Sequence, residues 1–600
     1  MERLIGVRRS SLMLSSAMTA CFALAMPASA QTDPAPSQNA VINLIHLLVK
    51  QHVITQKNAD ALVKEAEDEA ANARASAAPV PQPVAATQPP PPAPGVVRVP
   101  YVPEIVKNQI RDEVKEDVLK QAKAENWAQP EAVPAWTRRI TWMGDFRFRD
   151  EFDLFSKIND NELVDYATFN SSGPIDINSD TNPNGIPLLN TTQDRLDQLS
   201  VRLHLGMIAN ITDGVLLGVR LATGRDDSPV STTQILGGGL DKKAIWLDQA
   251  YITLKPLRWD SLTFGRMPDP FLRTDLVYDD NLNFDGAINT IQTKAAGENG
   301  LGVFTTLGAF PLEYVASGFP TNSFVKSPDR TKWLLAAQIG TDWTTDKFDW
   351  QLGVAYYDFQ NLQGQLSQPC AIYSGIKQCS SDPTRPAFMQ KGNTLFLIRN
   401  ILPNPATPTD YAQPQFVGLA ENYDELDGTT EFTTRVTNHY HLVLDADFVR
   451  NMAYDANAVC RYAPAGLPLN NVTPGVIAQT IPVENFDPCT AQTAPNTKAA
   501  LDSGPNAWMV KATFGVPKPR AAWEWNVSFG YKYIEPDAVV DAFNDHDFHQ
   551  GGTNAKGYFI GASLGLFNNT WLTGRWLSAD EVSGPPLAID VLQLDLNTSF

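Results

Sequence analysis

The sequence predicts an all-β transmembrane fold: a closed antiparallel outer-membrane β-barrel of about 16 strands, preceded by a helical extension on the periplasmic side. Three observations predict it. From residue 138 onward, apolar and polar residues alternate with a period of two. Several alternating segments reach 10 or more residues, the length of a tilted membrane-spanning strand. After the N-terminal 30 residues, no uncharged apolar run reaches the roughly 18 residues that a membrane-spanning helix needs.

The composition narrows the class of protein. Of the 600 residues, 43% are hydrophobic and 10% aromatic, so the chain is neither collagen-like nor wholly disordered. It carries 47 Lys and Arg against 66 Asp and Glu, and this net charge of −19 argues against nucleic acid as a partner. The apolar residues must therefore be buried without membrane-spanning helices, either in a large soluble β protein or in a barrel surrounded by lipid.

Residues 1–30 are predicted to be a secretory signal peptide. A positively charged segment with three arginines precedes a short apolar segment at 12–26. The cleavage site has the A-x-A form, with Ala28 and Ala30, and it leaves Gln31 as the first residue of the exported chain. Cleavage removes three basic residues and one acidic residue, which changes the net charge from −19 to −21.

Four cysteines remain after cleavage, and they lie in segments rich in Pro, Gly and Asn. In an oxidising compartment, sequence neighbours would pair as loop disulfides, Cys370 with Cys379 and Cys460 with Cys489. Four cysteines allow three pairings, so the sequence leaves the other two open. The C-x-x-C spacing of zinc and redox sites does not occur.

Three segments precede the barrel, which is expected to span 138–600. Residues 31–75 are predicted to be helical, because apolar residues recur at helical spacing. Residues 76–102 are rich in proline and are expected to form an extended linker. Residues 103–127 are predicted to form a second helix, for which a short coiled coil and a lone surface helix both remain open.

The segment from Trp523 to Tyr533 shows the alternation clearly. Aromatic and aliphatic residues occupy every second position, while Glu524, Lys532 and small polar residues occupy the other face. A soluble β-sandwich would alternate as well. We favour lipid because the strands are long and because aromatic residues cluster near strand ends, as in the girdles of outer-membrane barrels. The polar faces would then line an aqueous lumen.

Sixteen strands are expected, and they start near residues 138, 195, 214, 244, 259, 285, 300, 333, 348, 429, 440, 507, 521, 556, 570 and 588. Their connections alternate between short and long, like the periplasmic turns and external loops of outer-membrane barrels. With an even number of strands, this alternation of short and long connections places both termini in the periplasm and both proposed disulfides outside the cell. A further hairpin made of 393–401 and 414–424 would raise the count to 18.

Six different short motifs lie along the chain: Gly144 to Arg149, Leu247 to Ile252, Phe264 to Pro268, Phe284 to Gly286, Leu47-Leu48, and Val53 to Gln56. Together they resemble the putative porin family of bacterial outer membranes, over most of the chain. The resemblance implies an outer-membrane porin of a Gram-negative bacterium, a passive diffusion channel for small hydrophilic solutes and ions. It implies no particular substrate.

The last strand carries a further signal. Leu594 and Leu596 alternate with polar residues, and the chain ends on Phe600. This ending resembles the signal that the barrel assembly machinery of the outer membrane recognises. It implies that this machinery and outer-membrane lipid are partners of the chain.

Charged residues on the polar faces are candidates for the pore wall: Arg139, Asp145, Arg147, Arg149, Arg202, Arg220, Asp445, Asp447, Glu524, Lys532, Arg575 and Asp595. Opposed charges across a lumen would create a transverse field that filters solutes by charge and dipole. The alternative is that these groups only solvate the interior or pair with one another. The net charge predicts no ion selectivity, because part of it lies in loops and helices.

We expect no cofactor, no catalytic residue and no metal site. The G-x-S-x-G, P-loop and H-E-x-x-H motifs are absent from the sequence. The stripe from His439 to Asp447 is interpreted as a polar lumen face. Asp279 to Asn281, with Asp285, are interpreted as solvated charge of an external loop, and His546 to His549 as a loop segment without a metal.

Two other functions remain open. A structural or adhesive barrel would have its lumen closed by the long loops at 359–428 and 450–506, and its N-terminal helices would contact the cell wall. The second open possibility is an outer-membrane enzyme or a soluble secreted β protein. A homotrimer is expected only by analogy with porins.

Overall fold

The computed structural model describes residues 137–182, 185–293, 300–315, 318–321, 324, 326, 330–455, 469–470 and 503–600. The predicted signal peptide, both predicted helical segments, the proline-rich linker and the Cys460–Cys489 pair lie outside these residues. Within the described part of the chain, no helix is long and apolar enough to cross a membrane.

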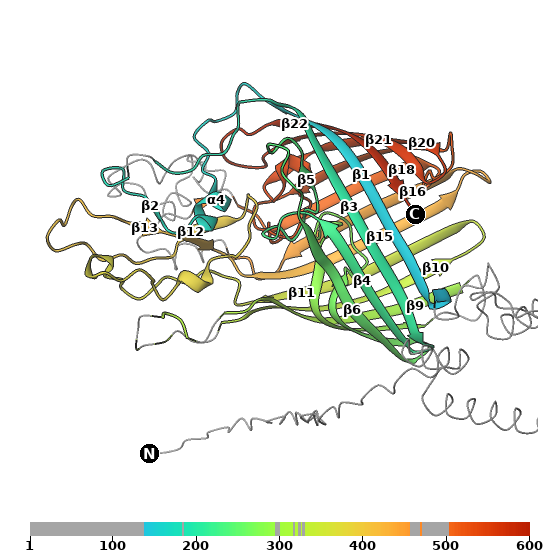
Figure 1. The fold of residues 1–600 in the computed structure, drawn as a ribbon, viewed down its shortest axis with the longest axis horizontal. Helices are drawn as coiled ribbons and strands as arrows, with labels where there is room; N and C mark the ends of the chain where they lie inside the picture. The colour runs from blue at the N-terminus through green and yellow to red at the C-terminus, as the bar shows by residue number, and fades with distance from the viewer. Residues whose placement is uncertain are drawn as a thin grey trace, which may run out of the picture. The chain divides into compact units, whose positions relative to one another are not determined.

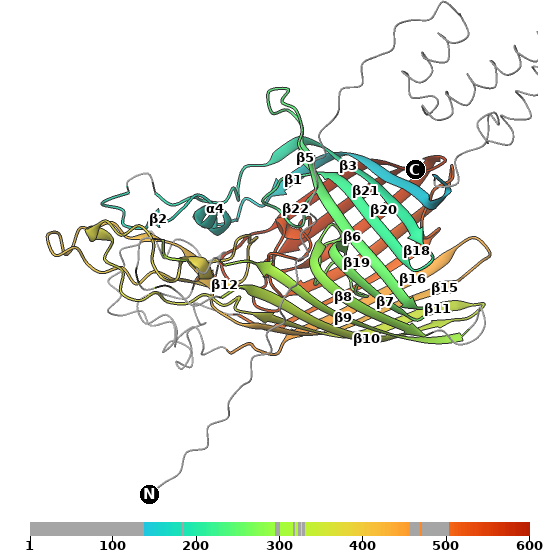
Figure 2. The same ribbon diagram turned by 60° about the horizontal axis from the view of Figure 1, so that its bottom comes forward.

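Sixteen long strands form one closed antiparallel sheet (Figures 1 and 2). They are β1 (Ile140–Phe155), β3 (Arg195–Thr212), β4 (Val215–Thr223), β6 (Ile245–Leu257), β7 (Asp260–Pro268), β8 (Asn283–Thr293), β9 (Gly300–Glu313), β10 (Lys332–Thr344), β11 (Phe348–Gln360), β15 (Tyr423–Arg435), β16 (His441–Asn451), β18 (Asn506–Gly515), β19 (Trp525–Ile534), β20 (Ala555–Phe567), β21 (Thr570–Asp580) and β22 (Ile589–Ser599). Each pairs with the next of these strands, and the predicted count of sixteen is confirmed.

The barrel closes where β22 pairs antiparallel with β1. The ladder continues to the last residue of the chain. The Gly144 N–H donates to the Phe600 carbonyl at 3.1 Å, and the Phe600 N–H donates to the Gly144 carbonyl at 3.0 Å. Closure therefore leaves neither terminal strand with an unpaired edge, as lipid requires.

The outer and inner faces are inverted relative to those of a soluble protein. On β22, the three outward leucines (Leu592, Leu594 and Leu596) are between 39% and 43% exposed, whereas Gln593 and Asp595 are buried inside the barrel. The other strands follow the same rule, with exposed Leu, Trp and Phe outside. The interpretation that apolar residues face lipid is confirmed.

The long connections lie together at one end of the barrel, and the short turns lie at the other (Figure 1). The long connections contain a small layer of short elements: α4 (Tyr166–Ser171), β2 (Ile175–Asp176), β12 (Thr394–Leu397), β13 (Pro414–Gln415), β14 (Val417–Leu419) and β17 (Leu469–Asn470). β5 (Gln234–Ile235) extends the sheet beside β3. The 3-10 turns η1, η2, η3 and η5 span Thr137–Arg139, Ile372–Ser374, Asp382–Thr384 and Phe548–Gln550.

The predicted alternative of 18 strands is wrong. Strands β12 and β14 pair with each other above the barrel, not with the barrel sheet. They are four and three residues long, too short to span a membrane. Both are buried on both faces, around Leu395 and Val417, so neither offers a surface to lipid.

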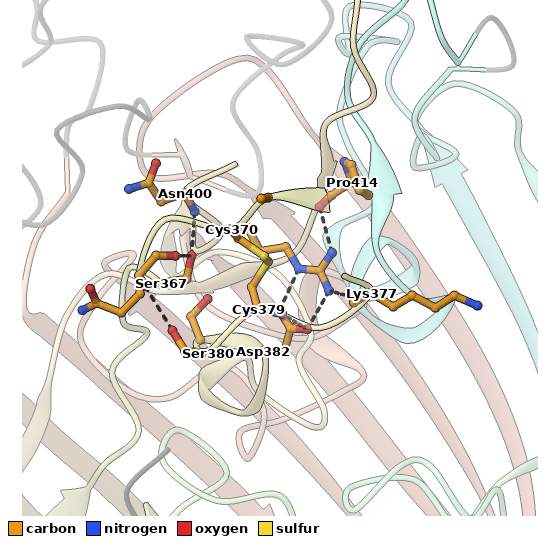
Figure 3. The surroundings of a disulfide bond; sticks show 12 residues. Ser367, Cys370, Lys377, Cys379, Ser380, Asp382, Asn400 and Pro414 are labelled. Atoms are coloured by element: carbon orange, nitrogen blue, oxygen red, sulfur yellow. Dashed lines mark hydrogen bonds and ion pairs between the residues drawn. A yellow bond between two sulfur atoms is a disulfide. The ribbon is translucent and has the colours of Figure 1, made fainter. Parts of the chain in front are cut away.

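A disulfide stabilises this layer, as the sequence predicts for Cys370 and Cys379 (Figure 3). Beside it, the buried guanidinium of Arg399 holds Asp382 through two hydrogen bonds of 2.7 and 2.6 Å. Asp382 in turn accepts from the Cys379 backbone N–H at 3.1 Å. The covalent bond and the ion pair thus hold the same turn.

Two strand starts differ from the prediction by four or more residues. β15 begins at Tyr423, earlier than expected, because its first inward residues are buried under the loop layer. β19 begins at Trp525, because Trp523 has a positive φ of 70° and lies in the preceding turn. The alternation of residue types continues through that turn by coincidence.

Crowding at the barrel seam, where β22 pairs with β1, leads to a prediction about stability. A Cβ added at Gly144 would lie 2.8 Å from the His204 carbonyl and 2.4 Å from the Phe600 ring. Gly144→Ala should therefore destabilise the seam by about 1–3 kcal/mol and lower the temperature at which the folded band unfolds in a heat-modifiability gel. Gly428→Ala is the control, since its Cβ would meet only the Phe448 carbonyl, at 3.9 Å. Equal unfolding temperatures for the two variants would contradict the proposed crowding.

The constricted lumen as candidate functional site

Two connections from the long-loop end fold into the barrel. We call residues 269–282, between β7 and β8, and residues 535–554, between β19 and β20, the inner loops. Phe271 makes edge-on ring contacts with Phe284 and Tyr357, whose side chains point inward from β8 and β11. Phe543 of the second inner loop stacks on Phe359 of β11 at 6.1 Å. The inner loops therefore bring an apolar core into the lumen.

This core narrows the lumen that the sequence predicts to be lined by polar faces. The first inner loop buries Leu276, Val277 and Tyr278, and the second buries three apolar residues from Ala538 to Val540. They pack with inward-facing apolar residues of β8–β11 and β15–β19. Apolar loop residues lose contact with water this way, which stabilises the inward conformation. One side of the lumen is consequently filled.

Lys532 anchors both inner loops to the barrel wall. Its Nζ lies 3.0 Å from the Asp275 carboxylate and 2.6 Å from that of Asp545. The residue is 1% exposed. An ammonium buried this deeply needs such partners, because an unpaired buried charge is costly. The predicted pore-wall position is thus an anchoring position.

Arg149 and Arg575 hold the second inner loop through Asp547. The Arg149 guanidinium donates to Asp547 at 2.9 Å and to Asp595 of β22 at 2.7 and 3.0 Å. Arg575 donates to the other Asp547 oxygen. Burial alone would raise the pKa of Asp547, but the two guanidinium groups and His546 hold that pKa well below its usual range. Asp547 is therefore a carboxylate.

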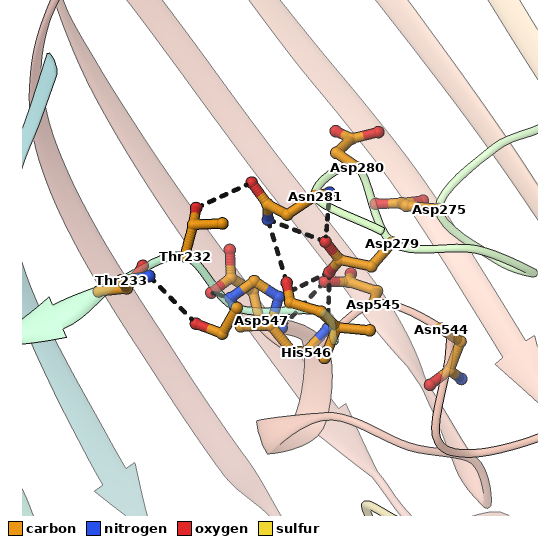
Figure 4. Close-up of polar contacts among 12 residues, drawn as sticks. Thr232, Thr233, Asp275, Asp279, Asp280, Asn281, Asn544, Asp545, His546 and Asp547 are labelled. Atoms are coloured by element: carbon orange, nitrogen blue, oxygen red, sulfur yellow. Dashed lines mark hydrogen bonds and ion pairs between the residues drawn. The ribbon is translucent and has the colours of Figure 1, made fainter. Parts of the chain in front are cut away.

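The inner loops are bonded to each other by His546 and Asp279 (Figure 4). Nδ1 of His546 and the Asp279 carboxylate are 2.6 Å apart, and Asp547 is 3.6 Å from the other ring nitrogen. Burial alone would lower the pKa of His546, but Asp547 and Asp279 raise it to about 9. The imidazole is thus a cation at neutral pH and links the two loops electrostatically.

The groups Asp279, Asp545 and His546 are also the set in the described part of the chain that could hold a metal ion, with ligand atoms within 4.8 Å of one another. Asp279 and His546 already bond to each other, and Asp545 pairs with Lys532. Asp279 was expected to be solvated loop charge, and this expectation is wrong, since Asp279 is buried against the second inner loop. We assign them a role in holding the loops.

Other predicted wall residues pair with neighbours. Asp145 bonds to Arg202 at 3.0 Å and to His204 at 2.9 Å. Arg220 pairs with Asp248, Asp445 with Lys511 at 3.2 Å, and Asp447 accepts from the Thr274 N–H and hydroxyl of the first inner loop. The stripe from His439 to Asp447 therefore serves separate contacts and does not converge on one point.

Three predicted wall residues have other surroundings. Arg139 is exposed in η1, where it donates to the Ile211 carbonyl at 3.0 Å. Glu524 is not on a strand: its carboxylate accepts from the backbone N–H groups of Ala521 and Arg520, which lower its pKa. Arg147 points inward and donates to the Thr233 hydroxyl at 2.7 Å.

Two sizeable cavities lie beside the inner loops. The larger, about 830 Å³, lies against β1 and β3 and is lined by charged groups of both signs, including Arg149, Glu151, Asp153 and Asp547. The smaller, about 480 Å³, lies against β4 and β6. Both cavities are lined by residues 386–388 and by Arg225, Asp227, Ser228 and Ser231. The unfilled part of the lumen therefore has charged, hydroxyl and apolar groups on its walls.

Sequence reasoning missed the acidic groups that face the basic wall. Asp275, Asp279, Asp545 and Asp547 were expected in external loops, yet they bond inside the barrel. A signal was present, because each inner loop carries a run of apolar residues beside its aspartates. Such a run is unusual for a loop exposed to water.

These features define a class of protein: a lipid-embedded β-barrel channel whose lumen is narrowed by inward loops. The family model described as putative porin matches residues 38–600, and the chain belongs to that family. It is a porin.

Solved structures with similarity include the outer-membrane channel DcaP of Acinetobacter baumannii (9% identity, 77% of this chain and 97% of that chain, TM-score 0.34). OprB of Pseudomonas putida matches at 12% identity over 77% of this chain and 95% of that chain, with a TM-score of 0.37. OmpF of Salmonella typhi in complex with daunomycin matches at 10% identity over 77% of this chain and 97% of that chain, with a TM-score of 0.34. No curated protein sequence matches the chain.

The anchoring role of Lys532 predicts a change in the channel. Lys532→Met should leave Asp275 and Asp545 without their cation and release the inner loops, at a cost of about 3–5 kcal/mol. Single-channel recordings should then show larger or noisier conductance than wild type. Lys511→Met is the control, because Lys511 is 37% exposed and pairs with one carboxylate. Identical recordings for all three proteins would refute the anchor.

The His546 link predicts a pH dependence. Because the pKa is raised to about 9 from 6.5, its stabilising effect is complete below pH 6.5 and is lost as the pH rises through about 9. Wild-type recordings should therefore become noisier as the pH passes 9. His546→Gln should be noisy already at neutral pH and should not change across that range. A wild-type transition that survives in the variant would show that another group is responsible.

Proposed function

We propose that this porin conducts small hydrophilic solutes and ions passively across the outer membrane. The observation that carries the proposal is the pair of cavities beside the inner loops, whose walls carry charged and hydroxyl groups as well as apolar side chains. Apolar loop residues fill one side of the lumen and leave these cavities open. A narrow polar passage lets water and small solutes through and excludes large ones.

The orientation follows from the loop lengths. We place the short turns and the N-terminal extension in the periplasm and the long connections, with the Cys370–Cys379 disulfide, outside the cell. Outer-membrane barrels with short periplasmic turns and longer external loops support this assignment. The outward residues of the last strand, which end at Phe600, support recognition by the barrel assembly machinery.

An outward carboxylate supports a homotrimer. Asp150 lies opposite Leu594 on one side and Leu199 on the other, and one of its oxygens is buried without a partner. A charged group facing lipid is costly. We propose that a second copy of the chain covers this face of β1, β3 and β22. Contact of the N-terminal helices with the cell wall is a further proposal, and it rests on the sequence alone.

A structural barrel with a closed lumen is less well supported, because the cavities leave room beside the inner loops. A catalytic role is not proposed, because the buried cations of the lumen, except Arg147, hold the inner loops or the wall through ion pairs. Asp447 likewise positions the first inner loop by accepting from Thr274.

The proposal is tested by conductance of the refolded mature chain in planar bilayers. Steady open-channel steps, together with exclusion of polyethylene glycols above a limiting size, are expected. Heat-unfolded protein at the same concentration is the control and should give no steps. A folded, heat-modifiable barrel that never conducts would reject the channel and favour the structural alternative.

A further inference from the structure

Arg147 differs from the other buried cations of the barrel wall. It lies on the inner face of β1 and is 7% exposed. Among the described residues, no carboxylate forms an ion pair with it, and its hydrogen bond goes to the neutral Thr233 hydroxyl at 2.7 Å. The other buried Lys and Arg residues of the strands, which are Arg149, Lys332 and Lys532, each bond to a carboxylate.

The neighbours of Arg147 do not supply the missing charge. On β3, the residue directly opposite is Arg202, whose partner is Asp145 at 3.0 Å. On β22, the residue opposite is Asn597, which is neutral. Two residues along the same strand, Arg149 bonds to Asp595, Asp547 and Glu151. Arg147 thus lies beside two further guanidinium groups whose carboxylates are already engaged.

An arginine in this position needs an anion. The guanidinium group remains charged at all relevant pH values and presents five N–H donors in a planar fork. Burying it without a partner is unfavourable. Its fork matches the oxygens of a carboxylate or a phosphate, which accept two parallel hydrogen bonds. A small oxyanion would therefore satisfy both the charge and the unused donors.

The position of Arg147 also fits a binding step on the path of a solute. Thr233, which accepts its hydrogen bond, lines the larger cavity of about 830 Å³, as do Gln198 and Ser200 of β3. A volume of this size holds a small organic molecule. The hydrogen bond to Thr233 therefore connects the Arg147 guanidinium group to the wall of this cavity, where hydroxyl and amide groups of β3 also lie.

We propose that Arg147 is an oxyanion-binding subsite of the channel, and that small carboxylate or phosphate solutes bind there as they pass. This inference rests on the proposed channel function and names its substrate class. Arg149 and Arg575 hold the second inner loop in place, whereas Arg147 is the buried strand cation, among the described residues, that no carboxylate pairs.

The test measures how succinate and inorganic phosphate block the chloride current of the full mature chain. In Arg147→Gln, the concentration that halves the current should rise about tenfold for both anions. In Arg147→Lys, which keeps the charge and loses the fork, a rise of about threefold is expected. Arg266→Gln removes the same charge from the inner wall but takes it from a pair with the half-exposed Asp285. The Arg266→Gln substitution should change the concentration that halves the current less than twofold.

Calorimetry of the same proteins in detergent, with the same two anions, gives a readout that needs no conductance. Block by succinate alone would identify carboxylates as the solutes, and block by phosphate alone would identify phosphates. If wild type and Arg147→Gln had the same half-blocking concentrations and the same calorimetric affinities, the subsite would be overturned while the channel remained intact. A wild type that binds the anions but never conducts would overturn the channel alone. If Arg147→Gln fails to give a heat-modifiable barrel, Arg147→Lys carries the comparison.

Discussion

Closure of the β22–β1 ladder is the constraint on which the rest of the molecule depends. Hydrocarbon offers no partner for a backbone N–H or carbonyl, so every strand needs two neighbours. Once the sheet is closed, its outer face must be apolar, and the inner face receives the polar residues. The barrel therefore lacks the usual source of stability inside, a continuous apolar core. What fills its interior has to come from elsewhere in the chain.

The inner loops supply this interior. Their apolar residues pack with the inward rings of β8–β11 and create a local core. Their aspartates bond to Lys532 of β19, Arg149 of β1 and Arg575 of β21. The two interactions depend on each other, since the apolar contacts exclude water and the exclusion of water strengthens the ion pairs. Together they hold two loops across a lumen that neither interaction alone would constrict so firmly.

The sequence predicts the barrel far better than the constriction, and the reason is physical. Lipid imposes a period of two on every strand, so each strand appears as a local pattern, and the predicted starts of β1, β3 and β20 lie within two residues of those observed. An inward loop has no such period. Whether residues 269–282 extend outward or fold inward depends on wall charges contributed by strands far away in the chain. Local pattern also misplaced Glu524, because the alternation of residue types does not reveal the positive φ of Trp523.

The same limit applies to the charged wall. Arg147 and Arg149 stand two residues apart on one strand face, and nothing in their spacing separates their roles. The structure separates them by their partners, because the second inner loop brings Asp547 to Arg149, whereas residues 231–235 bring the neutral Thr233 to Arg147. A charge that is fully paired holds the wall in place and has little attraction left for a passing ion. Selectivity in such a lumen therefore depends less on how many charges line it than on which of them the loops leave unpaired.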